Sequence, residues 1–132
     1  MPASYHIEAS LECISVTLEG IVTDQELIGG QRNMFDDPLF EGSYSRLVDA
    51  TAVSKLFVTA DCIRRLAKAA VQRGVRRVAL IAHTDFVYAM MRMYEGYAIE
   101  AECFVCRDRK AALAWLLGES KLASSPRMGV TG

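Results

Sequence analysis

Residues 75–95 read VRRVALIAHTDFVYAMMRMYE, and they predict a buried strand, a polar corner and an amphipathic helix. The run 78–82, VALIA, is apolar at every position. A strand with one face in water alternates apolar and polar residues, whereas a strand covered on both faces does not. Because the run is also short and aliphatic, we expect it to be a central strand of a parallel sheet.

The polar corner is His83-Thr84-Asp85, directly after this run. Thr84 or Asp85 can accept a hydrogen bond from the free amides of a starting helix. Asp49 ends another predicted strand in the same way, and ligands of open parallel sheets bind outside such carboxyl ends. His83 beside Asp49 or Asp85 would form a simple acid–base pair. Helix capping and turn formation explain the same residues equally well.

The helix predicted after the corner has more apolar residues than the single stripe of an ordinary surface helix needs. One face carries Val87, Met90, Met91, Tyr94 and Ala98, and the apolar surface is widened by Phe86, Ala89, Met93 and Tyr97. Three interpretations follow for residues 86–97. They are a helix buried deeply in the core, an interface with a second copy, or one wall of a lipophilic pocket.

The remaining elements follow the order β-β-α-β-α-β-α-β-α. Residues 5–9 and 11–20 predict an antiparallel hairpin, and Thr23-Asp24-Gln25-Glu26 is a capping box before a helix whose apolar face has one polar exception, Gln31. The later elements are a strand at 46–49, a loop at 50–57, a helix capped by Thr59, a strand at 103–106 and a helix capped by Asp108. This alternation predicts a single α/β domain over residues 1–118 with a mixed, mostly parallel sheet. Residues 119–132 lack periodicity and predict a mobile tail.

Composition narrows the possible partners. The chain has 132 residues, 52% of them hydrophobic, and a net charge of -1, which provides no general attraction to nucleic acid or to an anionic membrane. A basic row on and after the second helix has no interleaved aromatic residues to stack bases. No apolar run approaches the roughly 20 residues that span a bilayer, and the N-terminus lacks a secretory signal. We therefore expect a cytoplasmic protein without a nucleic-acid partner.

The four cysteines predict neither a metal site nor a cofactor. Cys103 and Cys106 form a C-x-x-C motif inside a predicted strand. Residues three apart in a strand point to opposite faces, so this pair is badly placed to share a metal ion. Small buried side chains in a reducing compartment are the simpler interpretation.

The order of these landmarks resembles that of the SpoIIAA-like proteins, within the STAS (anti-sigma-factor antagonist) and SEC14-like fold group. The resemblance covers about residues 5–118. It is carried by Gly20-Ile21-Val22-Thr23, Leu47-Val48-Asp49, Thr59-Ala60-Asp61, the run 78–82, Asp85, Arg92-Met93-Tyr94-Glu95, and residues 111–116 with Trp115-Leu116. It implies a small regulatory or ligand-binding domain, often dimeric.

Anti-sigma-factor antagonists carry a phosphorylatable serine in a D-S-S-G-type turn before the second helix. The matching residues here are Phe57-Val58-Thr59-Ala60-Asp61, which lack the serine and the glycine. Thr59 is the nearest hydroxyl, and helix capping is its first interpretation. A phosphate on Thr59 would lie at a helix N-terminus with basic residues nearby.

Taken together, the sequence favours a non-enzymatic regulatory or binding domain that works as a homodimer. Its candidate ligand or partner surface combines the strand-end residues Asp49, Thr59, His83, Thr84 and Asp85 with Phe86, Met90, Met93, Tyr94 and Tyr97 of the helix. The alternatives are a lipophilic small-molecule carrier of SEC14-like kind, and a small hydrolase or isomerase that uses His83 with Asp49 or Asp85.

Overall fold

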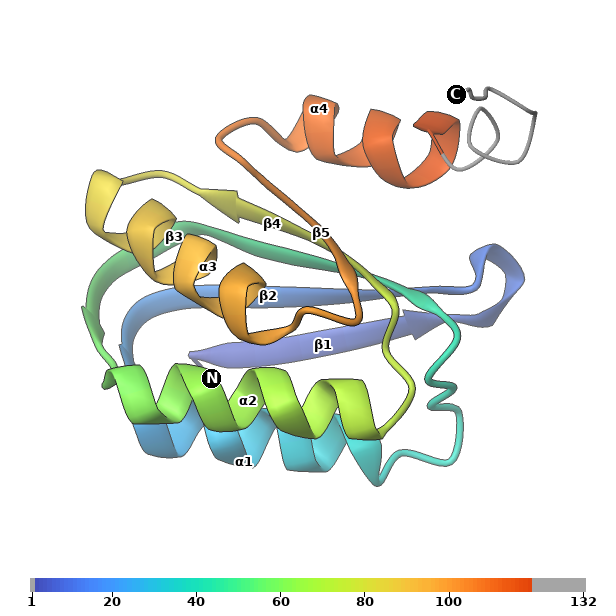
Figure 1. Ribbon diagram of the computed structural model, residues 1–132, viewed down its shortest axis with the longest axis horizontal. Coiled ribbons are helices and arrows are strands. Elements are labelled where there is room, and N and C mark those ends of the chain that lie inside the picture. Colours follow the sequence, from blue (N-terminus) through green and yellow to red (C-terminus); the bar gives the residue numbers. More distant parts are fainter. Residues whose placement is uncertain (1, 120–132) are drawn as a thin grey trace.

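A computed structural model describes residues 2–119, in which five strands form one mixed sheet of order β1-β2-β3-β4-β5 (Figure 1). β1 and β2 are antiparallel, and every later neighbour is parallel. The strands are β1 (Ala3–Glu8), β2 (Cys13–Thr23), β3 (Ser45–Phe57), β4 (Arg77–Ala82) and β5 (Glu102–Cys106). The helices are α1 (Asp24–Phe35), α2 (Ala60–Gln72), α3 (Asp85–Tyr97) and α4 (Arg109–Leu113), with a short turn η1 (Ala9–Leu11) and a wider turn η2 (Ala114–Glu119) that continues α4.

The three crossover helices α1, α2 and α3 pack on one face of the sheet, and α4 with η2 packs on the other (Figure 1). From β2 to β5 the strand order advances in one direction only. Right-handed crossovers that always advance in the same direction place all their helices on the same side. The predicted order of elements and the mixed sheet are confirmed.

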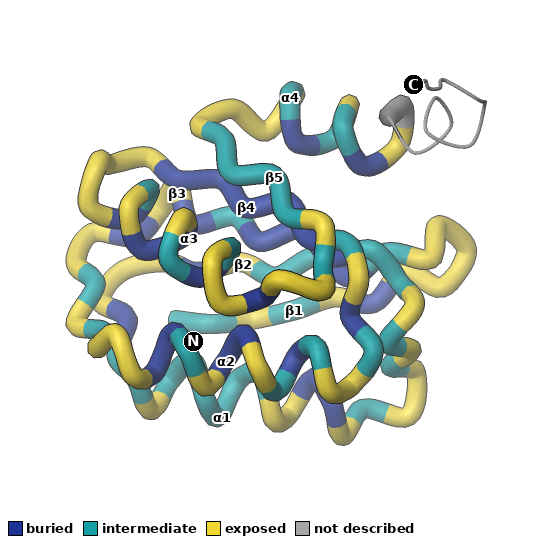
Figure 2. The backbone as a smooth tube through the Cα atoms, in the orientation of Figure 1, coloured by how far each residue is buried: buried dark blue, intermediate teal, exposed yellow. Residues whose placement is uncertain are grey.

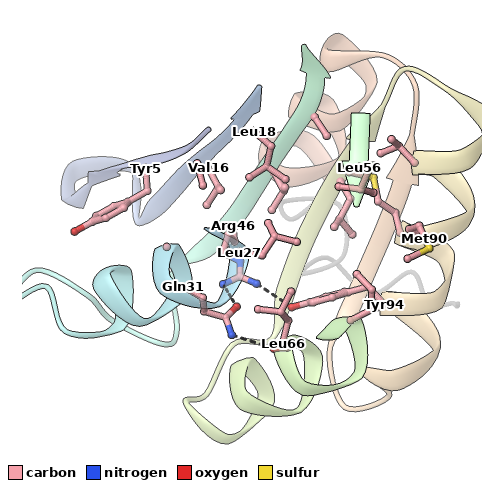
Figure 3. Close-up of a pocket in the computed structure, with 18 of the residues that line it drawn as sticks. Tyr5, Val16, Leu18, Leu27, Gln31, Arg46, Leu56, Leu66, Met90 and Tyr94 are labelled. Carbon is pink, nitrogen blue, oxygen red and sulfur yellow. Dashed lines mark hydrogen bonds between the residues drawn. The ribbon is translucent and has the colours of Figure 1, made fainter. Parts of the chain in front are cut away.

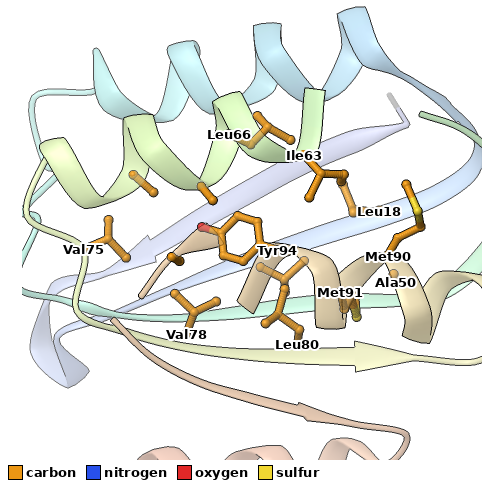
Figure 4. Close-up of a cluster of buried hydrophobic side chains, with 14 of the residues drawn as sticks. Leu18, Ala50, Ile63, Leu66, Val75, Val78, Leu80, Met90, Met91 and Tyr94 are labelled. Atoms are coloured by element: carbon orange, nitrogen blue, oxygen red, sulfur yellow. The ribbon is translucent and has the colours of Figure 1, made fainter. Parts of the chain in front are cut away.

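β4 is covered on both faces, as its unbroken apolar run predicts (Figure 2). Val78 and Leu80 belong to the larger core beneath the crossover helices, which Figure 4 shows around the ring of Tyr94. Ala79 and Ile81 belong to a second core under α4 and η2. The strand therefore joins the two layers of the molecule.

The predicted helix caps are present. Thr23 and Glu26 form the capping box of α1, and Thr59, Thr84 and Asp108 cap the three later helices with their side chains. These signals are short-range, so the local sequence is sufficient to specify them. Cys103 and Cys106 pack on opposite cores, as their spacing in a strand predicts.

The loop predicted at 50–57 is wrong, because β3 continues through these residues to Phe57. Pairing with β4 ends at Ala50, but pairing with β2 continues, with two register shifts that each insert an extra residue into β3. The residues directed toward the core are consequently Ala50, Val53 and Leu56, three apart. Such bulges remove the period of two on which strand recognition depends. Of the predicted tail at 119–132, all but Glu119 lies outside the described residues.

The double burial of β4 predicts a large penalty for truncating Ile81, which is 0% exposed. Ile81→Ala should lower the free energy of unfolding by about 2–5 kcal/mol, because it opens a cavity between β4 and α4. Ile99→Ala is the matched control, since Ile99 is 80% exposed and its truncation should change stability by less than about 0.5 kcal/mol. Urea unfolding followed by circular dichroism measures both, and equal effects would contradict this account of the core.

Candidate functional site

A cavity of about 120 Å³ lies between the sheet and the three crossover helices (Figure 3). Its walls are mainly apolar and include Val16 and Leu18 of β2, Leu27 of α1, Leu66 of α2 and Met90 of α3. Protein interiors are normally close-packed, so a hollow of this size in the main core requires an explanation. Engineered apolar cavities of about 150 Å³ remain dry and bind benzene, which sets the scale of what this one can hold.

The cavity reaches solvent beside the edge strand β1. Ser4 of β1 is exposed, and the lining residues Ala3, Tyr5 and Leu27 are half-buried. The lining residues from β4, α2 and α3 are all buried. The side of the pocket formed by β1 and α1 is therefore more exposed than the side formed by α3.

Small residues let α1 lie close to the edge strand β1 at one side of the pocket. Gly30 of α1 faces Ala3 of β1, and a Cβ atom placed on Gly30 would lie 3.3 Å from the Cβ of Ala3. Ala50 of β3 also lines the wall and extends no further than a methyl group. A side chain at Gly30 would crowd Ala3, whereas a larger residue at Ala50 would take up space in the pocket.

Among the described residues that line the pocket, Arg46 has the one charged side chain, and it is only 5% exposed. One Nη donates to the hydroxyl oxygen of Tyr94 at 2.8 Å, and the other donates to Oε1 of Gln31 at 3.4 Å (Figure 3). The Gln31 amide group in turn donates to the carbonyl oxygen of Leu66 at 3.2 Å. The Nε of Arg46 is buried and has no hydrogen-bond partner among the described residues.

Among the described side chains, which end at Leu117, no carboxylate pairs with Arg46. Arg77 also has a buried, unpartnered Nε, but its guanidinium pairs with Glu102 and lies over the Trp115 ring. Burying an ion costs several kcal/mol unless a partner compensates it. Arg46 has only neutral oxygens as partners.

Tyr94 connects this arginine to α3. Burial raises the pKa of its hydroxyl, although the Arg46 guanidinium opposes that shift. The hydroxyl oxygen accepts from Arg46, and its own proton has no acceptor among the described residues. The neutral hydroxyl of Tyr94 therefore has an unused O–H donor next to the Arg46 guanidinium, on the buried side of the pocket.

The strand-end residues predicted as a site lie outside the pocket lining, and the two carboxylates among them pair with arginines that follow β5. Asp85 pairs with Arg107 at 2.7 Å, and Asp49 pairs with Arg109 at 2.8 Å. His83 is exposed, and within residues 2–119 its ring makes no hydrogen bond to either carboxylate. The structure therefore does not assemble the predicted acid–base pair.

Thr59 lies apart from the pocket and from the strand-end ion pairs. Its hydroxyl donates to one oxygen of Asp24 and its amide to the other, each at 2.8 Å. Burial alone would raise the pKa of Asp24, but these hydrogen bonds and one from Cys62 lower it below its usual value. A phosphate on Thr59 would face a carboxylate at close range, and like charges so placed repel.

The apolar helix surface is divided between two environments. Val87, Met90, Met91 and Tyr94 of α3 are buried, and all four line the pocket. Met93 is half-buried against the core, whereas Phe86 and Tyr97 are 55% and 38% exposed. Residues 86–97 therefore supply core, pocket wall and exposed ends at once.

The sequence prediction missed Arg46 and the role of Gln31. Arg46 precedes Val48 and Ala50 at alternate positions of β3, so the period of two places it on the core side. Gln31 was visible as the polar exception on the apolar face of α1. Both signals were in the sequence, but only the folded chain shows that these two side chains meet.

The sequence matches no protein-family model and no curated protein. Among solved structures, the fold is similar to that of an uncharacterised protein of the DUF3478 family with a SpoIIAA-like fold, from Shewanella loihica PV-4. The TM-score is 0.60 at 18% identity, and the match covers 86% of this chain and 93% of that chain.

The chain has a SpoIIAA-like fold. The predicted resemblance is confirmed at the level of architecture. Within residues 2–119, this SpoIIAA-like chain has no helix that is both long enough and apolar enough to cross a bilayer.

The paired Asp49 predicts an acid-sensitive contribution to stability. Partial burial raises the pKa of Asp49, but hydrogen bonds from Thr51 and Arg109 outweigh it and leave the pKa below its usual value. The stabilisation is complete well above the unfolded value of about 3.9 and is lost as pH falls through that value and the lower folded pKa. Asp49→Asn should therefore flatten the acid limb of a stability–pH curve.

The matched control for this prediction is Asp36→Asn. Asp36 is exposed at the end of α1, and its side chain makes no hydrogen bond within residues 2–119. Urea unfolding at a series of pH values from 2 to 7 measures both variants. An unchanged acid limb in Asp49→Asn would show that the contact with Arg109 contributes nothing in solution.

Proposed function

We propose that this protein is a non-enzymatic binding domain that holds a small lipophilic molecule in the pocket between its sheet and α1, α2 and α3. The observation that supports this most strongly is the hollow of about 120 Å³ lined by residues of the main core. An empty cavity costs stability in proportion to its volume, and a ligand that fills it recovers the lost contacts.

The volume limits the ligand. Pockets for drug-sized molecules measure about 300–1,000 Å³, whereas this one holds a group the size of a single ring. A whole lipid does not fit within the walls. The pocket therefore supports a small-molecule binder over a carrier of complete lipids, with any larger ligand extending past β1 into solvent.

A role without catalysis agrees with the charges at the strand ends. Asp49 and Asp85 are each paired with an arginine, and His83 contacts neither of them within the described residues. A general base must come within hydrogen-bonding reach of the group that it serves. The polar side chains that line the pocket can bind a ligand through hydrogen bonds. They are those of Ser4, Tyr5, Gln31, Arg46 and Tyr94.

A homodimer is the second candidate, and the exposed Phe86 and Tyr97 favour it. Met90 and Tyr94 are buried within the subunit, so the surface left for a partner is smaller than the sequence suggested. α3 nevertheless carries both the pocket wall and these exposed ends. A ligand that packs against Met90 would contact α3, the helix that would also contact a second copy. Ligand binding would in this way shift the equilibrium between monomer and dimer, which is a simple form of regulation. Sedimentation equilibrium tests this, and a monomer at all concentrations would contradict it.

Filling the pocket with a side chain should abolish binding. Toluene at about 100 times its dissociation constant should stabilise the wild type by about 2.7 kcal/mol, seen as a higher midpoint of thermal unfolding. Val16→Phe places a ring in the pocket, so the midpoint should no longer respond to toluene. Aromatic residues suit strands, which limits damage to β2.

The matched control is Val105→Phe, because Val105 is half-buried on the edge strand β5 and lies outside the pocket lining. This variant should respond to toluene like the wild type. Native mass spectrometry of gently purified protein shows in parallel whether a small molecule co-purifies. A wild type that is indifferent to toluene and carries no ligand would refute the proposal.

A further inference from the structure

We infer that the natural ligand is a small hydrophobic monocarboxylate, whose carboxylate binds Arg46 and Tyr94 while its apolar part fills the pocket. This inference rests on the proposed function and adds the charge and chemical class of the ligand. It starts from two neighbouring side chains of the pocket, Arg46 and Tyr94, which have hydrogen-bond donors without an acceptor among the described residues.

The first donor group is the guanidinium of Arg46. It carries five N–H groups in a planar fork, and its two hydrogen bonds, to Tyr94 and Gln31, use two of them. Its Nε is buried, and among the side chains of residues 2–117 it has no hydrogen-bond partner and the guanidinium has no carboxylate partner. A guanidinium fork matches the two oxygens of a carboxylate, which is the geometry of the strong bidentate pairs in proteins.

The second donor is the hydroxyl of Tyr94. It lines the same pocket, its oxygen accepts from Arg46, and its proton has no acceptor among the described residues. An anion placed on Arg46 would lie within reach of this proton as well. One carboxylate would satisfy both groups, whereas a purely apolar ligand would satisfy neither.

Gln31 limits the ways in which Arg46 can move. Its Oε1 accepts from the guanidinium, and its amide nitrogen is held by the carbonyl oxygen of Leu66. The arginine is thus supported from α1 on one side and from α3 on the other. A pre-positioned cation binds an anion at little cost in conformational entropy.

The charge on the pocket lining favours a ligand with a single negative charge. Of the lining residues that the structure describes, Arg46 alone carries a charge. A phosphate monoester carries a charge of about -1.5 to -2 at neutral pH, so a single buried arginine would leave it under-neutralised. A carboxylate of charge -1 matches the arginine, and the volume of about 120 Å³ leaves room for an apolar part of about one ring.

Three test ligands separate this inference from the proposed function. Benzoate has the inferred charge and size, benzamide has the same shape without the charge, and toluene is wholly apolar. Isothermal titration of the wild type at pH 7 should show benzoate binding at least about tenfold more tightly than benzamide, because hydrogen bonds to charged groups in a buried site are strong. Toluene reports whether the pocket is occupied at all.

Arg46→Met removes the cation and keeps the length and apolar character of the side chain. This variant should bind benzoate at least about tenfold more weakly than the wild type and should bind toluene at least as well. Arg92→Met is the matched control, since Arg92 is an exposed residue of α3 that pairs with Glu95, and it should retain the preference for benzoate. Tyr94→Phe should lower benzoate affinity several-fold without weakening toluene binding.

The outcomes are distinguishable. If toluene binds but benzoate has no advantage over benzamide, the inference is overturned and the proposed function stands. If no ligand binds the wild type, the proposed function fails as well. If Arg46→Met does not fold, Tyr94→Phe and the three ligands on the wild type still test the inference. A preference of the wild type for benzoate that Tyr94→Phe reduces supports it. Equal binding of benzoate and benzamide by the wild type overturns it.

Discussion

The one-directional order of the sheet is the constraint from which the rest of this structure follows. Because the strand order advances steadily from β2 to β5, all three crossover helices pack on one face, and a single short helical segment covers the other. The crowded face has to be filled by side chains from three helices and five strands. The pocket lies within this face, beside the place where α1 closely approaches the edge strand β1.

The same constraint bears on the strand ends, where the sequence predicted a site. Ligands bind at the carboxyl ends of doubly wound sheets where the strand order reverses, since the two crossovers then separate to opposite faces. This sheet has no reversal between β2 and β5. The polar residues at its strand ends instead form ion pairs with Arg107 and Arg109, which hold the segment after β5 against the sheet.

Arg46 gives the pocket its chemical character. A buried guanidinium with neutral partners costs stability, and replacing such a group with an apolar side chain is often neutral or stabilising. Tyr94 and Gln31 offset part of that cost by hydrogen bonds, yet they leave Nε unpaired. The arrangement joins an apolar hollow to one positive charge, and this combination is more specific than either feature alone.

Local signals in the sequence determined the order of elements, the burial of β4, the hairpin and the helix caps, because each depends on residues a few positions apart. The tertiary structure alone decided the extension of β3, since its bulges arise from pairing with β2 and break the periodicity. It alone also decided the site. Arg46, Gln31 and Tyr94 come from three separate elements, and only the packing of α1 and α3 on β3 brings them around one cavity.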